Sequence, residues 1–109
     1  MGVVVSLYYL SGPMSGYPDF NIPAFNDAAA KLRAKGLQVI SPPEIDGSTD
    51  KTWDQYLRQD LKALLDCHHI VLMPGWQESR GAKLEHAVAV GLGMRVWRLG
   101  ELLYGEALL

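Results

Sequence analysis

Hydrophobic and polar positions alternate along the chain in a way that predicts strands separated by helices. Residues 3–10, VVVSLYYL, are mostly β-branched or aromatic and carry no charge, which is typical of a strand buried on both faces of a parallel sheet. Shorter apolar runs at residues 37–40, 69–73 and 94–99 lie beside glycines and prolines. These runs predict three further strands.

Three intervening segments carry apolar residues at helical spacing. Residues 22–35 have a proline just inside the start and a glycine after the end. Residues 53–65 follow a candidate cap at Asp50 or Thr52. Residues 81–92 form the third predicted helix.

The order strand, helix, strand, helix, strand, helix, strand predicts an α/β fold. We expect three layers, α/β/α, around a four- to five-stranded, mainly parallel sheet of the flavodoxin or Rossmann-like kind. Residues 1–99 are interpreted as one domain, which suits a chain of 109 residues. Residues 100–109 predict either a short helix or an arm that packs on a neighbouring subunit. Their apolar side chains favour a homodimer or a higher homo-oligomer.

Charge and composition limit the class of ligand. The formal net charge is -2, and the 10 lysine and arginine residues are scattered along the chain. This disfavours a polynucleotide partner and leaves a small nucleotide as a candidate ligand. The single cysteine, Cys67, excludes an intrachain disulfide and fits a reducing cytoplasm. The N-terminal apolar run is shorter than the ~20 residues that span a bilayer, so we expect a cytoplasmic protein with no membrane partner.

Two loops carry the candidate chemistry, because ligands of open parallel sheets bind beyond the carboxyl ends of the strands. SGPMSGYPDFN follows the first strand, and PGWQESRG follows the third strand and leads into a helix. Ser79 and Gly81 lie at that helix start, where free N–H groups favour a phosphate. Each loop also has a purely structural interpretation, as a turn or as a helix cap. The chain contains neither GxGxxG nor GxxxxGK[ST].

Glu85 lies one to two turns into the third predicted helix. It is adjacent to the face that we expect to pack against the sheet, formed by Leu84, Ala87, Val88 and Gly91. Its carboxylate is therefore either a solvated surface group or a group that points over the end of the sheet. Because a helix N-terminus favours negative charge, we expect Glu85 to stay ionised.

Asp60 falls inside the apolar stripe of the second predicted helix, at helical spacing from Tyr56, Leu57 and Leu64. A carboxylate rarely occupies such a stripe without a partner or a task. It is either a buried structural acceptor or an acid whose pKa is raised by desolvation.

The other candidate groups are less specific. Cys67, His68 and His69 are adjacent and suggest a metal site, but neighbouring side chains on a strand point to opposite faces, and the sequence offers no second ligand pair. We therefore expect no metal and no organic cofactor. Trp76, at the tip of the second loop, is either a wall on which a base stacks or a rim aromatic that packs on the next helix.

Three stretches together resemble the DUF4406 family, which is often found in phages and prophages: YYLSGPMSG-x-PDFN-x-PAFN, W-x-x-YLRQDL and LMPGW-x-x-SRGA-x-LEHAVA-x-GLG. The resemblance covers residues 7–98. That family is similar in turn to the nucleoside 2-deoxyribosyltransferases and the deoxynucleoside 5′-monophosphate N-glycosidases. The shared features are a tyrosine and a glycine after the first strand, an aspartate in the middle helix, and S-x-G-x-x-x-E entering the third helix.

The resemblance to these enzymes implies roles for individual residues. Glu85 matches the glutamate that attacks C1′ of the deoxyribose, and Asp60 matches the acid that protonates the departing base. Tyr9 and Gly12 match residues of the first loop near the sugar and the phosphate.

The implied phosphate site is matched less completely. Ser79 and Gly81 match the phosphate cradle of the monophosphate hydrolases. Pro13 stands where those hydrolases carry a serine that helps to hold the phosphate, so a preference for monophosphates does not follow. Asn21 and Trp76 belong to the DUF4406 pattern and are kept as candidate substrate-binding residues.

These matches predict an enzyme that cleaves or transfers the N-glycosidic bond of a (deoxy)nucleoside or its 5′-monophosphate through a glutamate nucleophile. The predicted partner is a small-molecule nucleoside or nucleotide. One alternative is a module that binds or sequesters a nucleotide without catalysis, and another is an assembly protein that binds none. PGW-x-x-SRG-x-x-x-E also loosely resembles the PGG-x-GT-x-x-E of nucleotide phosphoribohydrolases, which leaves ribose substrates open.

Overall fold

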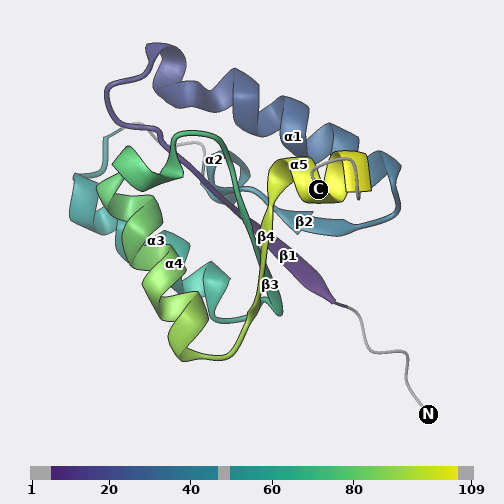
Figure 1. Cartoon of the computed structure of the whole chain (residues 1–109). Helices are drawn as coiled ribbons and strands as arrows, with labels where there is room; N and C mark the ends of the chain where they lie inside the picture. Colours follow the sequence, from purple (N-terminus) through teal and green to yellow (C-terminus); the bar gives the residue numbers. More distant parts are fainter. Residues whose placement is uncertain (1–5, 47–49, 106–109) are drawn as a thin grey trace.

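The computed structural model describes residues 6–46 and 50–105. Within these residues, four parallel strands form one sheet in the order β2-β1-β3-β4 (Figure 1). The strands are β1 (Leu7–Ser11), β2 (Gln38–Ile40), β3 (His69–Leu72) and β4 (Arg95–Arg98). The predicted α/β class and parallel sheet are confirmed, with the lower of the two predicted strand numbers.

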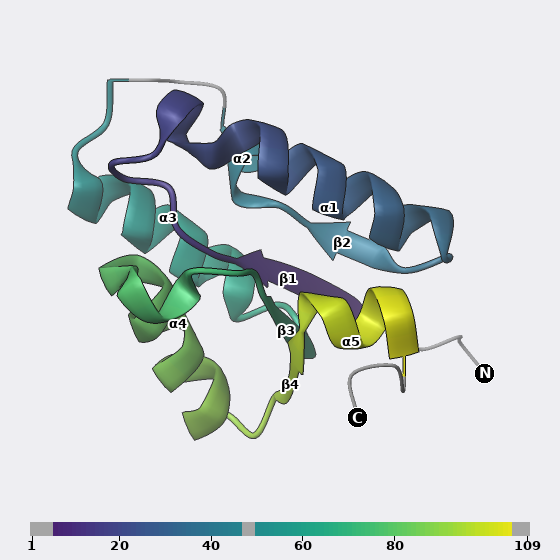
Figure 2. The same ribbon diagram turned by 45° about the horizontal axis from the view of Figure 1, so that its top comes forward.

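Helices cover both faces of the sheet. α1 (Ile22–Ala34) and α5 (Leu99–Tyr104) pack on one face, and α3 (Trp53–Leu64) and α4 (Arg80–Gly91) pack on the other. A short helix, α2 (Pro42–Ile45), follows β2. Figure 2 shows the sheet between these two groups of helices. The chain therefore has the predicted α/β/α architecture.

Successive residues of β1 point to opposite faces of the sheet, and this alternation builds two cores. Leu10 joins Phe25 and Leu32 of α1 in one core, whereas Tyr9 lies with Leu64 of α3 in the other. Ser11 is two residues beyond Tyr9 and so shares its face. The hydroxyl side chains at the end of β1 therefore face the α3 and α4 layer.

Some boundaries differ from the predicted ones. The predicted first strand includes residues 3–5, which lie outside the described residues. The prolines that follow the second predicted strand, Pro42 and Pro43, open an additional short helix, α2, because a first helical turn does not need the N–H that proline lacks. The C-terminal segment forms a short helix, α5, that packs on α1 as far as Tyr104, and residues 106–109 lie outside the described residues.

α4 turns a different face to the sheet from the one that the sequence predicts. Its buried residues are Ala82, Glu85 and Ala89, while Leu84 is 42% exposed. Small alanine side chains let a helix approach its neighbours closely, so the bulkier apolar residues of α4 lie outside. The predicted packing face is therefore wrong for its exposed members, Leu84, Ala87 and Gly91.

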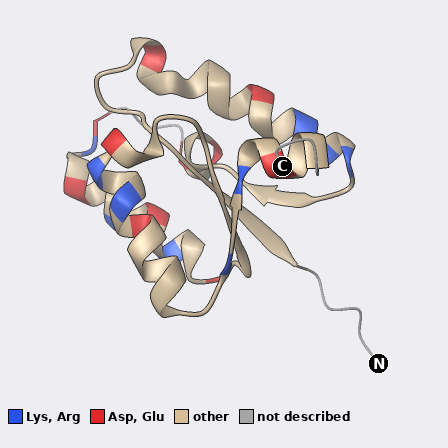
Figure 3. Cartoon of the chain, in the orientation of Figure 1, with Lys and Arg blue, Asp and Glu red and all other residues tan. Residues whose placement is uncertain are grey.

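Charged residues are distributed over several elements. Figure 3 shows basic and acidic positions interspersed along the helices, in keeping with the small net charge of -2. In the part of the chain that the structure describes, no helix combines the length and the hydropathy needed to cross a membrane.

Candidate active site

Glu85 reaches the end of β1 from the second turn of α4. Ser79 caps this helix, because its Oγ accepts a hydrogen bond from the Ala82 N–H at 3.2 Å. The Glu85 side chain points at the sheet, and only 5% of the residue is exposed. Tyr9 donates its hydroxyl to Glu85 Oε2 at 2.6 Å, and Ser11 donates its hydroxyl to Oε1 at 2.7 Å. Buried hydroxyl groups therefore hold both oxygens of the carboxylate.

The protonation of Glu85 is set by burial. Burial raises the pKa of Glu85 to about 7, although the hydrogen bonds from Ser11 and Tyr9 each lower it. Among the described residues, no lysine, arginine or histidine forms a salt bridge with this carboxylate. The expectation of an ordinary ionised glutamate is thus wrong, because the helix N-terminus acts mainly within its first turn and does not outweigh desolvation here.

Asp60 is the second carboxylate of the site, and it comes from α3. Burial, and to a smaller extent the charge of Glu85, raises the pKa of Asp60 to about 7. This is the direction that its place in an apolar stripe predicts. Since the two carboxylates repel each other, ionising one of them makes the other harder to ionise.

Both carboxylates line one cavity of about 350 Å³ at the carboxyl end of the sheet. Its walls are formed by four parts of the chain: the loop that follows β1, helix α2, helix α3 and the start of α4. Much of the lining is aromatic or aliphatic, and these side chains are Met14, Phe20, Ile22, Phe25, Trp53, Tyr56 and Leu57. The cavity combines an apolar wall with two titratable groups, which is the usual composition of a small-molecule site.

Gly12, Ser79 and Gly81, three of the predicted substrate-binding residues, also line this cavity. A side chain at position 12 would not fit, because a Cβ there would lie 2.9 Å from the Cβ of Met73. The tight approach between the loop and the end of β3 therefore requires glycine at this position. Ser79 serves as the cap of α4 as well as lining the cavity.

Tyr9 and Asn21 contribute from behind the wall. Tyr9 is fully buried, and its hydroxyl meets the site at the Glu85 carboxylate. The side-chain amide of Asn21 donates to the backbone carbonyl of Pro13 at 2.9 Å, so it braces the loop after β1. Neither residue lines the cavity.

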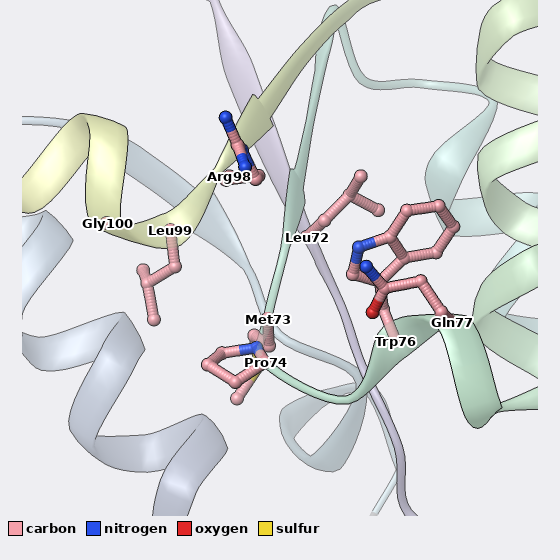
Figure 4. Close-up of a pocket in the computed structure, with 8 residues that line it drawn as sticks. All are labelled: Leu72, Met73, Pro74, Trp76, Gln77, Arg98, Leu99 and Gly100. Carbon is pink, nitrogen blue, oxygen red and sulfur yellow. The ribbon is translucent and has the colours of Figure 1, made fainter. Parts of the chain in front are cut away.

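Trp76 lies elsewhere, so the expectation that it walls this site is wrong. Gly75, with φ of 87°, turns the chain so that the Trp76 ring packs against His86, with ring centroids 4.6 Å apart. Trp76 lines a separate hollow of about 290 Å³ between the ends of β3 and β4 (Figure 4). Of the two alternatives predicted for Trp76, the structure agrees with the second, a rim aromatic that packs on the next helix.

Ser11 and the aromatic residues of α3 belong to the site but are not among the residues that the sequence predicts for it. Ser11 could have been found, since it lies two residues after Tyr9 on a strand and must share its face. Trp53 and Tyr56 lie seven and four residues before Asp60, which places all three on one side of a helix. The spacing of these residues along the helix therefore suffices to predict that Trp53 and Tyr56 lie beside Asp60.

Basic groups also lie around the cavity. Lys51 lines it and forms a salt bridge with Asp46. The guanidinium of Arg80 lies over the Trp53 ring, 4.3 Å from the ring centroid. In residues 6–46 and 50–105, no group of three or more His, Cys, Asp and Glu side chains is arranged to hold a metal ion.

Comparisons with known proteins agree with this architecture. The chain is similar in structure to a chain described as 2-desoxiribosyltransferase from Leishmania mexicana, with a TM-score of 0.66 and 18% sequence identity. The match covers 85% of this chain and 63% of that chain. No curated protein matches the sequence. The family model for a domain of unknown function, DUF4406, matches residues 6–98, so the chain belongs to the DUF4406 family.

Proposed function

We propose that this protein cleaves or transfers the N-glycosidic bond of a (deoxy)nucleoside or its 5′-monophosphate, with Glu85 as the nucleophile. The observation that carries the proposal is the pairing of Glu85 and Asp60 in one cavity, with the Glu85 carboxylate fixed by Tyr9 and Ser11. The likeness in fold to a deoxyribosyltransferase agrees with it.

Glu85 supplies the electron pair in the first step. Each carboxylate oxygen accepts one hydrogen bond and keeps a second lone pair, which can attack the anomeric carbon of the sugar. The C1′–O bond to Glu85 forms as the C1′–N bond to the base breaks, through an oxocarbenium-like transition state. The two hydroxyl donors fix the carboxylate and reduce the freedom lost on reaching that state.

Asp60 supplies the proton. With a pKa of about 7, its carboxyl is protonated in a large fraction of molecules at neutral pH. That proton passes to the departing base, so that a neutral base leaves. Asp60 is then a carboxylate. In the second step, water or an acceptor base attacks C1′, the C1′–O bond to Glu85 breaks, and Asp60 takes the proton that the attacking group loses.

The size and lining of the cavity suit a nucleoside. About 350 Å³ is within the range of small-molecule sites, ~300–1,000 Å³. Trp53 and Tyr56 offer flat surfaces to a planar base. Ser79 and Gly81 at the start of α4 offer a helix N-terminus to a 5′-phosphate.

Release of free base is the assay that tests this proposal. Wild type is incubated with the deoxynucleosides, the ribonucleosides and their 5′-monophosphates, and the free base is separated by chromatography. Glu85→Gln should lower the rate by at least ~10³-fold, because an amide is a poor nucleophile. Glu78→Gln is the matched control, since Glu78 is exposed in the turn before α4. Full activity in Glu85→Gln would remove the nucleophile assignment.

A nucleotide-sequestering module is the second candidate, and Pro13 favours it. Pro13 is buried and its carbonyl accepts from Asn21, so this position offers no hydroxyl to a phosphate. This candidate predicts tight binding of a nucleotide and no release of base over hours. Wild type and Glu85→Gln would then behave alike in the assay above.

A further inference from the structure

The turn Pro18–Asn21, between β1 and α1, has an unusual backbone. Asp19, Phe20 and Asn21 have φ of 51°, 52° and 61°, all in the left-handed region. Among residues other than glycine, Asp and Asn enter this region most readily and then as single residues, so a run of three that includes Phe20 is uncommon. Strain of this kind persists only where the surroundings hold it, and it is concentrated at binding and catalytic sites.

Hydrogen bonds at both ends hold this left-handed turn in place. The Phe20 N–H donates to the carbonyl of Tyr17 at 3.0 Å. The Asn21 side chain ties the end of the turn to Pro13, at the start of the loop after β1. α1 begins directly afterwards, at Ile22. The turn is therefore fixed at both ends to elements that line the cavity.

The turn presents Phe20 to the cavity without burying it. Phe20 lines the cavity and is 59% exposed, whereas Phe25, in the first turns of α1, is fully buried in the core. A large apolar ring gains free energy by burial, so a fixed exposed ring at a cavity is available to a ligand. The turn contributes one aromatic wall, while Trp53 and Tyr56 contribute another from α3.

We propose that Phe20 is a specificity-determining residue that covers the base of a bound nucleoside. This inference rests on the proposed function for the identity of the ligand, and it adds how the base is recognised. Every base has a flat π surface, so stacking tolerates different bases, and a purine offers more area than a pyrimidine. Phe20 therefore contributes more to the binding of purine nucleosides than to that of pyrimidine nucleosides.

Calorimetric titration with 2′-deoxyadenosine and 2′-deoxycytidine tests this role. Glu85→Gln is used as the background, so that binding is measured without turnover. Phe20→Ala should raise Kd for 2′-deoxyadenosine about 10-fold or more and Kd for 2′-deoxycytidine less, while Phe20→Tyr keeps both within about 2-fold. The matched control is Tyr104→Ala, which removes another exposed aromatic, 64% exposed, that lies on α5 away from the cavity.

The outcomes separate this inference from the proposed function. An unchanged Kd in Phe20→Ala, or an equal change in Tyr104→Ala, would overturn the role of Phe20 even if wild type releases base. A change in oligomeric state with unchanged binding would also overturn it, because Phe20 would then belong to a protein interface. Weaker binding in Phe20→Ala, with no base release by wild type, would support it and remove the glycosidase. Absence of binding to both nucleosides, and to their 5′-monophosphates in the same titration, would overturn both.

Discussion

Glu85 is a buried carboxylate stabilised by neutral hydroxyl donors, without a salt bridge among the described residues. Such an arrangement leaves the group close to the point where it gains or loses its proton, with a pKa of about 7. Both hydroxyl groups can donate to Glu85 only when its carboxylate is ionised, because both oxygens are then acceptors. If Glu85 binds a proton, one of its oxygens becomes a donor and one hydroxyl must turn. Tyr9 and Ser11 therefore favour the nucleophilic form.

Removing the Ser11 hydroxyl tests this balance. In Ser11→Ala, Glu85 loses one of the hydrogen bonds that lower its pKa, so the acid limb of the rate profile should move to higher pH. At neutral pH we expect base release to fall roughly 10-fold, from the loss of one hydrogen bond to a charged group. Ser6→Ala is the control, because Ser6 is exposed ahead of β1 and does not line the cavity. An acid limb at the wild-type pH in Ser11→Ala would contradict this role.

At the scale of elements, α3 and α4 each carry one carboxylate to the cavity, and each begins at a side-chain cap. Thr52 caps α3 with a capping box: its Oγ1 accepts from the Gln55 N–H, and the Gln55 side chain accepts from the Thr52 N–H at 2.9 Å. Ser79 caps α4. Because these ends fix the start of each helix, they also fix the depth at which Asp60 and Glu85 enter the cavity.

Loss of the Thr52 cap should cost stability. Thr52→Ala removes the side-chain acceptor of the box and should lower the free energy of unfolding by about 1 kcal/mol, measured by urea denaturation. Thr52→Ser keeps the acceptor and should stay close to wild type. Equal stability of Thr52→Ala and wild type would show that the box contributes nothing in solution.

The helices and strands follow from the sequence more closely than the faces that they bury. Glycine, proline and capping residues predict most element boundaries within a few residues, because they act through the local backbone. The buried face of α4 depends on how closely the helix approaches the sheet. That distance is set by alanines, whose small side chains allow a close approach. Hydrophobicity along the helix therefore favoured Leu84, although Ala82 and Ala89 lie inside.

At the scale of the molecule, the cavity joins segments that are distant in the sequence. Asp60 and Glu85 could be selected singly, by an apolar stripe and by family resemblance, but their meeting in one cavity depends on the packing of α3 beside α4. Trp76 is selected as a site residue in the same way, but the direction of a side chain at a loop tip does not follow from sequence. The left-handed backbone of Gly75 directs the Trp76 ring away from the cavity. In the left-handed turn, Asp19 and Asn21 are residue types that tolerate positive φ, but Phe20 carries no such signal.

The buried pair of carboxylates should make the stability of the whole protein depend on pH. The pKa of Glu85 rises from 4.5 to about 7 on folding and that of Asp60 from 3.8 to about 7. Between these values the folded state binds more protons than the unfolded state, so the free energy of unfolding falls as pH rises towards 7 and then levels off. The pKa of Glu44 is lowered by Arg33, and that effect is confined to acidic pH, below its ordinary value.

Thermal unfolding at constant protein concentration, from about pH 5 to about pH 8, measures this dependence. Tm of wild type should fall over this range, and Tm of Glu85→Gln should change less, because the substituted side chain does not titrate. A rising Tm in wild type, or the same slope in both proteins, would contradict the raised pKa values.

The central claim is that Glu85 forms a covalent bond to the sugar, and the stereochemistry of the product tests it most directly. With methanol as the acceptor, the sugar is released as a methyl glycoside whose anomeric configuration can be read by NMR. Attack by Glu85 followed by attack of methanol inverts C1′ twice, so a β-nucleoside should give the β-methyl glycoside with wild type and none with Glu85→Gln. The α-methyl glycoside would show a single displacement and contradict a glutamate nucleophile.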